Sequence, residues 1–248
     1  MLKGKKIVLG VTGGIAVYKA VDLVSKLRKQ GAEVRVVMTE HAQQFVTPLT
    51  FKEISGNKVA VSMWNANQEF NVEHIALADW ADLFMVVPAT ANIIAKMAYG
   101  IADDLLSTTL LAAHSPVIVC PAMNTHMYEN PASQENIAKI KSRGIVVMPP
   151  ASGVLACGAV GAGRLPEPAD IVNFVKDFFA KTEGDMRGLK VLVTAAGTRE
   201  PIDPVRYVGN RSSGKMGYSI AQAAAERGAE VTLVTGPSAL TPPPNIKV

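Results

Sequence analysis

The sequence has few cysteines, few aromatic residues and no long hydrophobic run, and each shortage excludes a class of protein. Two cysteines, Cys120 and Cys157, are too few for a disulfide scaffold or a cysteine-rich zinc cluster. No stretch approaches the roughly 18 uninterrupted apolar residues of a membrane helix, and the N-terminus shows no signal-peptide cleavage site. These absences predict a protein of a reducing, cytoplasmic setting with no membrane partner.

The charge distribution argues against one class of partner and leaves another open. The net charge is +4 and the isoelectric point is near 9.0, but Lys and Arg are scattered and aromatic residues make up only 6%. A nucleic-acid partner is therefore not expected, whereas anionic small molecules are compatible with this balance. Hydrophobic residues make up 48% of the 248 residues, enough for a large folded core.

Short β-branched runs alternate with stretches of helical periodicity along the first 180 residues. The first strand is expected at 6–12, the first helix at 15–30 and the second strand at 33–38. Further strands are expected at 83–87, 116–120 and 144–148, and further helices at 92–97, 104–113, 133–143 and 171–180. Continuous apolar strands separated by helices predict a doubly wound parallel α/β sheet of the Rossmann or flavodoxin-like kind.

The opening pattern recurs after a polar, glycine-punctuated stretch. Residues 189–248 repeat the strand, turn and second strand of the first domain. We therefore expect a domain at 1–180, a linker at 181–188 and the start of a second Rossmann-like domain at 189–248. One βαβ unit is too small to close a core of its own, so we expect a fragment of a longer protein or a tail that packs on something else.

The loops after the strands hold the candidate ligand-binding residues. Gly13 and Gly14 follow the first strand, where backbone N–H groups and a helix N-terminus suit a phosphate, although an ordinary tight turn explains them equally well. They do not form the G-x-G-x-x-G fingerprint of dinucleotide sites. Thr39 stands where an NAD site would carry an acid, which favours a mononucleotide such as FMN over NAD.

Later loops add candidates, each with a structural alternative. Thr90, Ala91 and Asn92 begin a helix and Asn124 follows a strand, but Asn and Thr are also ordinary helix caps. His74 is one of four histidines, and a single histidine is more often structural than catalytic. Cys157 lies in a glycine-punctuated segment typical of a mobile flap, or is a small buried residue. The residues alone indicate a mononucleotide-binding α/β protein.

The motifs together resemble a known family, the homo-oligomeric flavin-containing cysteine decarboxylases. The resemblance rests on the 12–16 turn, His74 with 77–82, and the segments 88–92, 100–106, 121–124 and 156–158. Segments 198–206 and 210–217 resemble the opening of phosphopantothenate–cysteine ligase. Over its whole length the chain is similar to the bacterial bifunctional family that fuses the two activities in coenzyme A biosynthesis.

The resemblance implies FMN-dependent decarboxylation of 4′-phosphopantothenoylcysteine to 4′-phosphopantetheine, through thioaldehyde and enethiol intermediates. It implies that His74 acts as base or orienting group, that Asn124 holds the substrate carboxylate with Met127 beside it, and that Cys157 supplies a proton. For FMN it implies Gly13, Gly14, Ile15, Thr39, Thr90, Ala91 and Asn92. Relatives build the site between subunits, so we expect a homo-oligomer based on trimers, of the kind that assembles into a dodecamer.

For the second part, the resemblance implies a ligase that uses CTP and Mg²⁺, with Asn210 handling the acyl intermediate. The sequence stops before most of that nucleotide pocket, so we expect ligase activity only in a longer chain. Three alternatives remain at this stage: another flavin-dependent cysteine decarboxylase, a non-catalytic relative that regulates a phosphatase, and an NAD-dependent dehydrogenase. The retained His74, Asn124 and Cys157, and the lack of an acidic tail, weigh against the regulatory reading.

Overall fold

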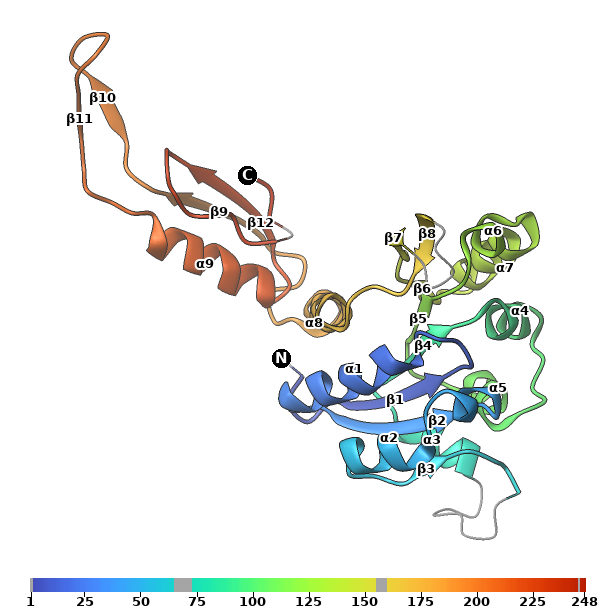
Figure 1. Cartoon of the computed structure of the whole chain (residues 1–248). Coiled ribbons are helices and arrows are strands. Elements are labelled where there is room, and N and C mark those ends of the chain that lie inside the picture. Colours follow the sequence, from blue (N-terminus) through green and yellow to red (C-terminus); the bar gives the residue numbers. More distant parts are fainter. Residues whose placement is uncertain (1, 65–72, 155–159, 245) are drawn as a thin grey trace. The chain divides into compact units, whose positions relative to one another are not determined.

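The computed structural model of the chain describes residues 2–64, 73–154, 160–244 and 246–248 (Figure 1). The chain divides into two compact units, Leu2–Val172 and Asn173–Val248. Among the described residues, no helix is both long enough and apolar enough to cross a membrane.

The first unit is built on a six-stranded sheet with the order β3-β2-β1-β4-β5-β6, in which every neighbouring pair is parallel. Its strands are β1 (Lys6–Val11), β2 (Glu33–Met38), β3 (Val59–Ala60), β4 (Leu83–Ala89), β5 (Val117–Pro121) and β6 (Val146–Val147). The chain runs outward from β1 to β3 and then crosses back to β4 on the other side of β1. The doubly wound parallel sheet predicted from the sequence is thus confirmed, and its topological switch point lies between β1 and β4.

Helices cover both faces of this sheet, as continuous apolar strands require. The helices of the first unit are α1 (Val17–Lys29), the 3₁₀ turn η1 (His41–Gln44), α2 (Pro48–Ser55), α3 (Glu73–Trp80), α4 (Ala91–Tyr99), α5 (Leu105–Ala112), α6 (Thr125–Glu129) and α7 (Pro131–Ser142). A further helix, α8 (Pro168–Glu183), begins in the first unit and continues into the second. α1 packs with α2 against β2, while α3, α4, α5 and α7 contact one another in series (Figure 1). Every residue of β4 is buried between these layers.

Local sequence signals explain where two of these helices begin. Thr90 caps α4 by accepting a hydrogen bond from the Ile93 amide. Asp104 and Ser107 form a reciprocal capping box at the start of α5. After α7 and β6, the chain forms an antiparallel hairpin of β7 (Ala151–Val154) and β8 (Val160–Arg164).

The second unit is small. Its β9 (Lys190–Ala195) pairs in parallel with β12 (Glu230–Thr235), α9 (Lys215–Glu226) packs on both strands, and β10 (Arg199–Pro201) forms an antiparallel pair with β11 (Tyr207–Gly209). A compact apolar cluster includes Tyr218 and Leu233. α8 runs through Glu183, into the stretch expected as linker, and near its end the Thr182 hydroxyl donates a hydrogen bond to the Phe178 carbonyl at 2.9 Å.

Candidate functional site

A cavity of about 590 Å³ lies at the carboxyl ends of β1, β4 and β5, beside the topological switch point. This is the place where doubly wound sheets bind ligands, and the volume is within the range of about 300–1,000 Å³ typical of small-molecule sites. The lining residues are Gly13, Gly14, Ile15, Ala16, Tyr18, Lys19, Pro88, Thr90, Ala91, Ala122, Met123, Asn124, Met127, Gly163, Arg164 and Leu165. All belong to the first unit.

A buried threonine joins two of the loops that form the cavity. The Thr12 hydroxyl donates to the Pro88 carbonyl at 2.7 Å and accepts from the Thr90 amide at 3.1 Å. Thr12 is 2% exposed, so neither bond is easily replaced by water. The loop after β1 and the loop after β4 are therefore held at a fixed spacing.

The two glycines after β1 meet different surroundings. A Cβ atom on Gly13 would lie 2.5 Å from the His41 Cβ and 2.8 Å from the His41 carbonyl carbon. A Cβ on Gly14 would meet only the Thr90 methyl group, at 3.8 Å. Gly13 thus permits close packing on η1, while the missing side chain of Gly14 leaves space at the cavity wall, where the first turn of α1 begins.

The structure gathers part of the predicted FMN set. Gly13, Gly14, Ile15, Thr90 and Ala91 line the cavity together. Thr39 and Asn92 are not among the described lining residues: the Thr39 hydroxyl accepts a hydrogen bond from the Ala42 amide at 3.3 Å, and Asn92 is exposed in the first turn of α4. Ile15 is apolar and 61% exposed, and it lies on the cavity wall, where a ligand could cover it.

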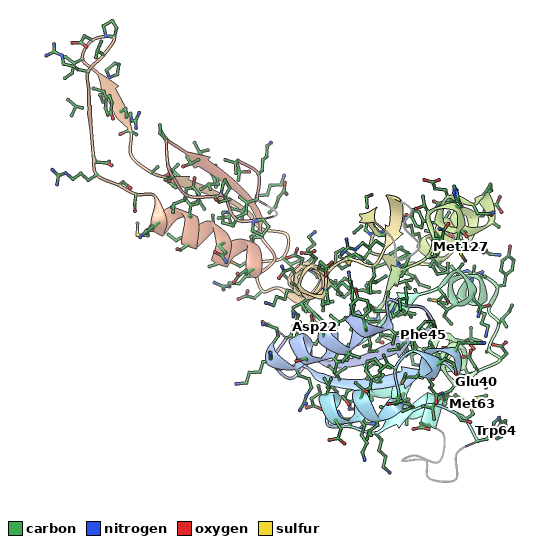
Figure 2. The ribbon with its side chains drawn as sticks, viewed as in Figure 1. Asp22, Glu40, Phe45, Met63, Trp64 and Met127 are labelled. Atoms are coloured by element: carbon green, nitrogen blue, oxygen red, sulfur yellow. The ribbon has the colours of Figure 1, made fainter. Side chains whose placement is uncertain are left out.

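The predicted substrate residues Asn124 and Met127 line the same cavity from another element. Asn124 caps α6, its side-chain oxygen accepting a 2.9 Å hydrogen bond from the His126 amide, and it also lines the cavity. Met127 projects from α6 and is 50% exposed (Figure 2). The helix-cap reading and the ligand-binding reading of Asn124 therefore both fit its position.

Two cations line the cavity, and the sequence reasoning did not single out either of them. Lys19 and Arg164 both contribute to the wall, and none of the described lining residues is acidic. Lys19 is 6% exposed and shares the buried face of α1 with Leu23 and Leu27. The sequence did contain a signal for Lys19, because a lysine among the apolar positions of a helix needs a polar partner for its charge. Glu167, which is not among the described lining residues, pairs with both cations, so the three side chains together keep one positive charge, which suits an anionic ligand.

Glycines in β8 bring the hairpin against the Asn124 loop. The Met123 amide donates to the Gly163 carbonyl at 2.9 Å. Gly163 has φ +121°, and a Cβ there would lie 2.3 Å from the Met123 carbonyl oxygen. At Gly161, a Cβ would lie 2.6 Å from the Thr125 hydroxyl oxygen. Only glycine allows β8 to approach this closely.

The other predicted site residues lie elsewhere. His74 is half-buried in the first turn of α3 and is absent from the described cavity wall. Cys157 lies outside the described residues. Asn210 is exposed in the second unit, where its side-chain oxygen accepts from the Ser212 amide at 3.0 Å and faces Gly197. Within the described ranges, no three His, Cys, Asp or Glu side chains group to hold a metal ion.

Cys120, the other cysteine of the chain, is not among the described residues that line the cavity. Cys120 is fully buried in β5, and burial raises the pKa of its thiol to about 12. It therefore stays protonated and unreactive at neutral pH, as the apolar run around it predicts.

The fold and the cavity define a class: a doubly wound α/β protein with a ligand site at its topological switch point. The chain belongs to the flavoprotein family, whose model matches residues 1–180. The family described as DNA/pantothenate metabolism flavoprotein C-terminal domain matches residues 186–248. The resemblance seen in the motifs is confirmed.

Individual relatives agree with this assignment. The chain is 51% identical over 245 residues to the coenzyme A biosynthesis bifunctional protein CoaBC of Haemophilus influenzae, covering 99% of this chain and 61% of that protein. It thus spans about three fifths of the length of this relative. A solved PPC decarboxylase variant complexed with pantothenoylaminoethenethiol is similar with a TM-score of 0.63 and 31% identity, over 71% of this chain and 99% of the other. The FMN-dependent cysteine decarboxylase SpaF is similar with a TM-score of 0.61 and 30% identity, over 70% and 96%.

Proposed function

We propose that the first unit binds FMN and decarboxylates 4′-phosphopantothenoylcysteine to 4′-phosphopantetheine in coenzyme A biosynthesis. The observation that carries the proposal is the cavity at the switch point, which joins a glycine turn, Asn124 and two cations in one space free of described acidic groups. Relatives named for this pathway and for FMN-dependent cysteine decarboxylation support the choice of substrate and cofactor.

The residues present fit FMN. Gly14 leaves open the space that a Cβ would fill, and the adjacent backbone N–H groups and α1 N-terminus favour an anion. Ile15, Thr90 and Ala91 are proposed to contact FMN on this side of the cavity. Thr39 and Asn92 remain candidates for contacts with the part of FMN that extends beyond the described cavity wall. When bound, FMN supplies a reversible hydride acceptor, which gives a cysteine amide the electron sink that it lacks.

The protein residues position the substrate and handle its protons. Asn124 is proposed to hold the substrate carboxylate through its side-chain amide, with Met127 packing beside it. Cys157 is proposed to protonate the decarboxylated product, and His74 to accept the thiol proton or orient the thiol. Exclusion of water by the apolar lining would strengthen each of these polar contacts.

The position of His74 supports a homo-oligomer. In one subunit it lies outside the described cavity wall, so we propose that His74 of one subunit completes the cavity of another, in trimers that can assemble further. Phe45 follows the carboxyl end of β2 and Trp64 follows the carboxyl end of β3 (Figure 2). They are 50% and 88% exposed, and such exposed aromatic side chains suit an interface between subunits.

Subunit sharing has a sharp test. His74→Asn and Cys157→Ser subunits are each expected to lack turnover. If the two residues come from different subunits, co-expression of the variants with separate affinity tags should restore turnover, because mixed oligomers contain some cavities with both native groups. Failure of every isolated mixed oligomer to turn over would contradict sharing, and sedimentation would report the subunit number directly.

For the second unit we propose the opening part of a CTP- and Mg²⁺-dependent phosphopantothenate–cysteine ligase. Asn210 and Gly197 lie together beside the start of α9, a place where a phosphate-bearing intermediate fits. Ligase turnover is proposed for the longer protein that the relatives represent. Formation of phosphopantothenoylcysteine from CTP, cysteine and phosphopantothenate by these 248 residues would show that this portion suffices.

The first experiment is a visible spectrum of the purified protein, followed by anaerobic mixing with 4′-phosphopantothenoylcysteine. Bound oxidised flavin and release of carbon dioxide are expected. A protein that cannot be loaded with FMN would contradict the proposal. Turnover of a peptide ending in cysteine, with none of the phosphorylated substrate, would favour another flavin-dependent cysteine decarboxylase, a choice that the similarity to SpaF makes worth testing.

A further inference from the structure

Lys19 is a buried cation of the cavity wall to which the proposed function assigns no individual role. It is 6% exposed, and its ammonium donates to the Leu165 carbonyl at 3.1 Å and to Glu167 Oε1 at 2.8 Å. Both partners lie nearly 150 residues further along the chain, in the segment that follows β8. A cation on the apolar face of a helix is tolerated when it is paired in this way.

Glu167 also forms an ion pair with Arg164, the second cation of the cavity wall. Its Oε1 also accepts from Arg164 Nη2 at 2.8 Å. Lys19, Arg164 and Leu165 all line the cavity. One carboxylate thereby fixes the spacing between α1 and the end of β8 at the point where both form the wall.

The two elements joined by Lys19 serve different halves of the cavity. α1 begins at Val17, shortly after the Gly13–Gly14 turn, on the side proposed for FMN. The segment that holds Glu167 continues from Gly163, whose carbonyl is bonded to the Met123 amide next to Asn124. Movement of this segment relative to α1 would therefore change the distance between the flavin side and the substrate side.

The side chain of Lys19 is 7% exposed and that of Glu167 is 54% exposed, so only one end of this ion pair is buried. Such a pair is weak evidence for stability, because desolvation of the buried charge and solvent screening of the exposed one offset much of the attraction, and its better-supported use is to specify one conformation. We infer that Lys19 is a positioning residue, which sets the substrate side of the cavity against the flavin side through Leu165 and Glu167. This inference rests on the proposed function, because it assigns the two sides to substrate and cofactor.

The test uses the 248-residue protein with FMN bound. Lys19→Met removes the charge at similar volume, Lys19→Arg retains it, and Glu167→Gln weakens the other partner. Lys26→Met is the matched control, because Lys26 lies on the same helix and forms an ion pair with Asp22 in which both side chains are exposed. The measurements are flavin content, kcat and KM for 4′-phosphopantothenoylcysteine, and hydrogen exchange at the amides of residues 161–165 and 167, since Pro166 has no amide hydrogen.

Lys19→Met and Glu167→Gln are expected to keep FMN and to exchange faster at the amides of residues 161–165 and 167. Their kcat/KM is expected to fall roughly tenfold to a hundredfold, since small misplacements of reacting groups reduce the rate by about this factor. Lys19→Arg should restore most of the loss, and Lys26→Met should match wild type. Wild-type kcat/KM in Lys19→Met would overturn the inference. If Lys19→Met fails to fold, Glu167→Gln decides, and wild-type exchange and kcat/KM in that variant would overturn it.

Failure of the proposed function would be recognised separately. In that case the wild-type protein itself would lack FMN binding or carbon dioxide release. The exchange measurement would still report whether Lys19 fixes the segment, because it requires no turnover.

Discussion

The Thr12 hydroxyl and the Pro88 carbonyl are joined by a buried 2.7 Å hydrogen bond that links the loops after β1 and β4. Thr12→Val would keep the shape but leave the Pro88 carbonyl and the Thr90 amide without this partner. We expect it to lower the free energy of unfolding by about 1–3 kcal/mol and to reduce FMN content. Thr12→Ser keeps the hydroxyl and is the control. Denaturant unfolding that shows equal stability for the Val and Ser variants would contradict the prediction.

The neighbouring glycines should respond differently to alanine. Gly13→Ala forces the new methyl group into His41, including its backbone, so we expect a loss of about 1–3 kcal/mol in unfolding free energy. Gly14→Ala has room and should unfold like wild type, but its methyl group narrows the proposed FMN site. Thermal unfolding and flavin absorbance, measured on both variants, separate the two effects. If the flavin-free Gly14→Ala variant were as unstable as Gly13→Ala, this prediction would be contradicted.

Asn124→Asp separates the capping role from the proposed substrate role. Aspartate caps a helix as well as asparagine, so the bond to the His126 amide and the fold should persist. The added negative charge opposes a substrate carboxylate. We therefore expect unchanged FMN content and stability with kcat/KM reduced at least about a hundredfold, corresponding to about 2.7 kcal/mol of transition-state binding. Full activity in this variant would exclude carboxylate binding by Asn124.

Gly163→Ala should displace β8 from the Met123–Asn124 loop. The substitution suffers both from the positive φ and from a methyl group 2.3 Å from the Met123 carbonyl oxygen. Gly144→Ala is a matched control, since Gly144 also has a positive φ, +84°, but open space around it. We expect kcat/KM to fall about tenfold or more in Gly163→Ala only. Equal steady-state parameters in the two variants would show that the contact with Met123 is unimportant.

Glu167 gives a pH dependence of stability with a definite sign. The hydrogen bond from Lys19 holds the pKa of the Glu167 carboxyl below its ordinary value, with the nearby charges of Lys19 and Arg164 adding to the effect. A lowered pKa in the folded state stabilises the protein above the unfolded-state value, about 4.3, and this contribution disappears as the pH falls through the folded value. Urea unfolding between pH 7 and pH 3.5 should show wild type losing more stability than Glu167→Gln. Parallel profiles would contradict this assignment.

The regular elements could be predicted from the sequence because their signals are local. Apolar runs such as Glu33–Met38 were located to the residue, and the capping residues at 90 and 104 mark their helices. The short strand β3, the helices α2 and α3 and the β7–β8 hairpin were not predicted. Their stability depends on packing against the sheet or on pairing with a distant partner, and their own periodicity is weak.

The sequence by itself determined the fold class, the family and the set of candidate residues, because strand alternation and motif order are properties of the chain. Only the tertiary structure decided which candidates share a cavity. It placed Asn124 and Met127 in one cavity with the Gly13–Gly14 turn, left His74 outside the described wall, and brought Lys19 to Leu165 and Glu167. The physical reason is that the sheet order gathers strand ends from distant parts of the chain, and no local pattern encodes the distance between them.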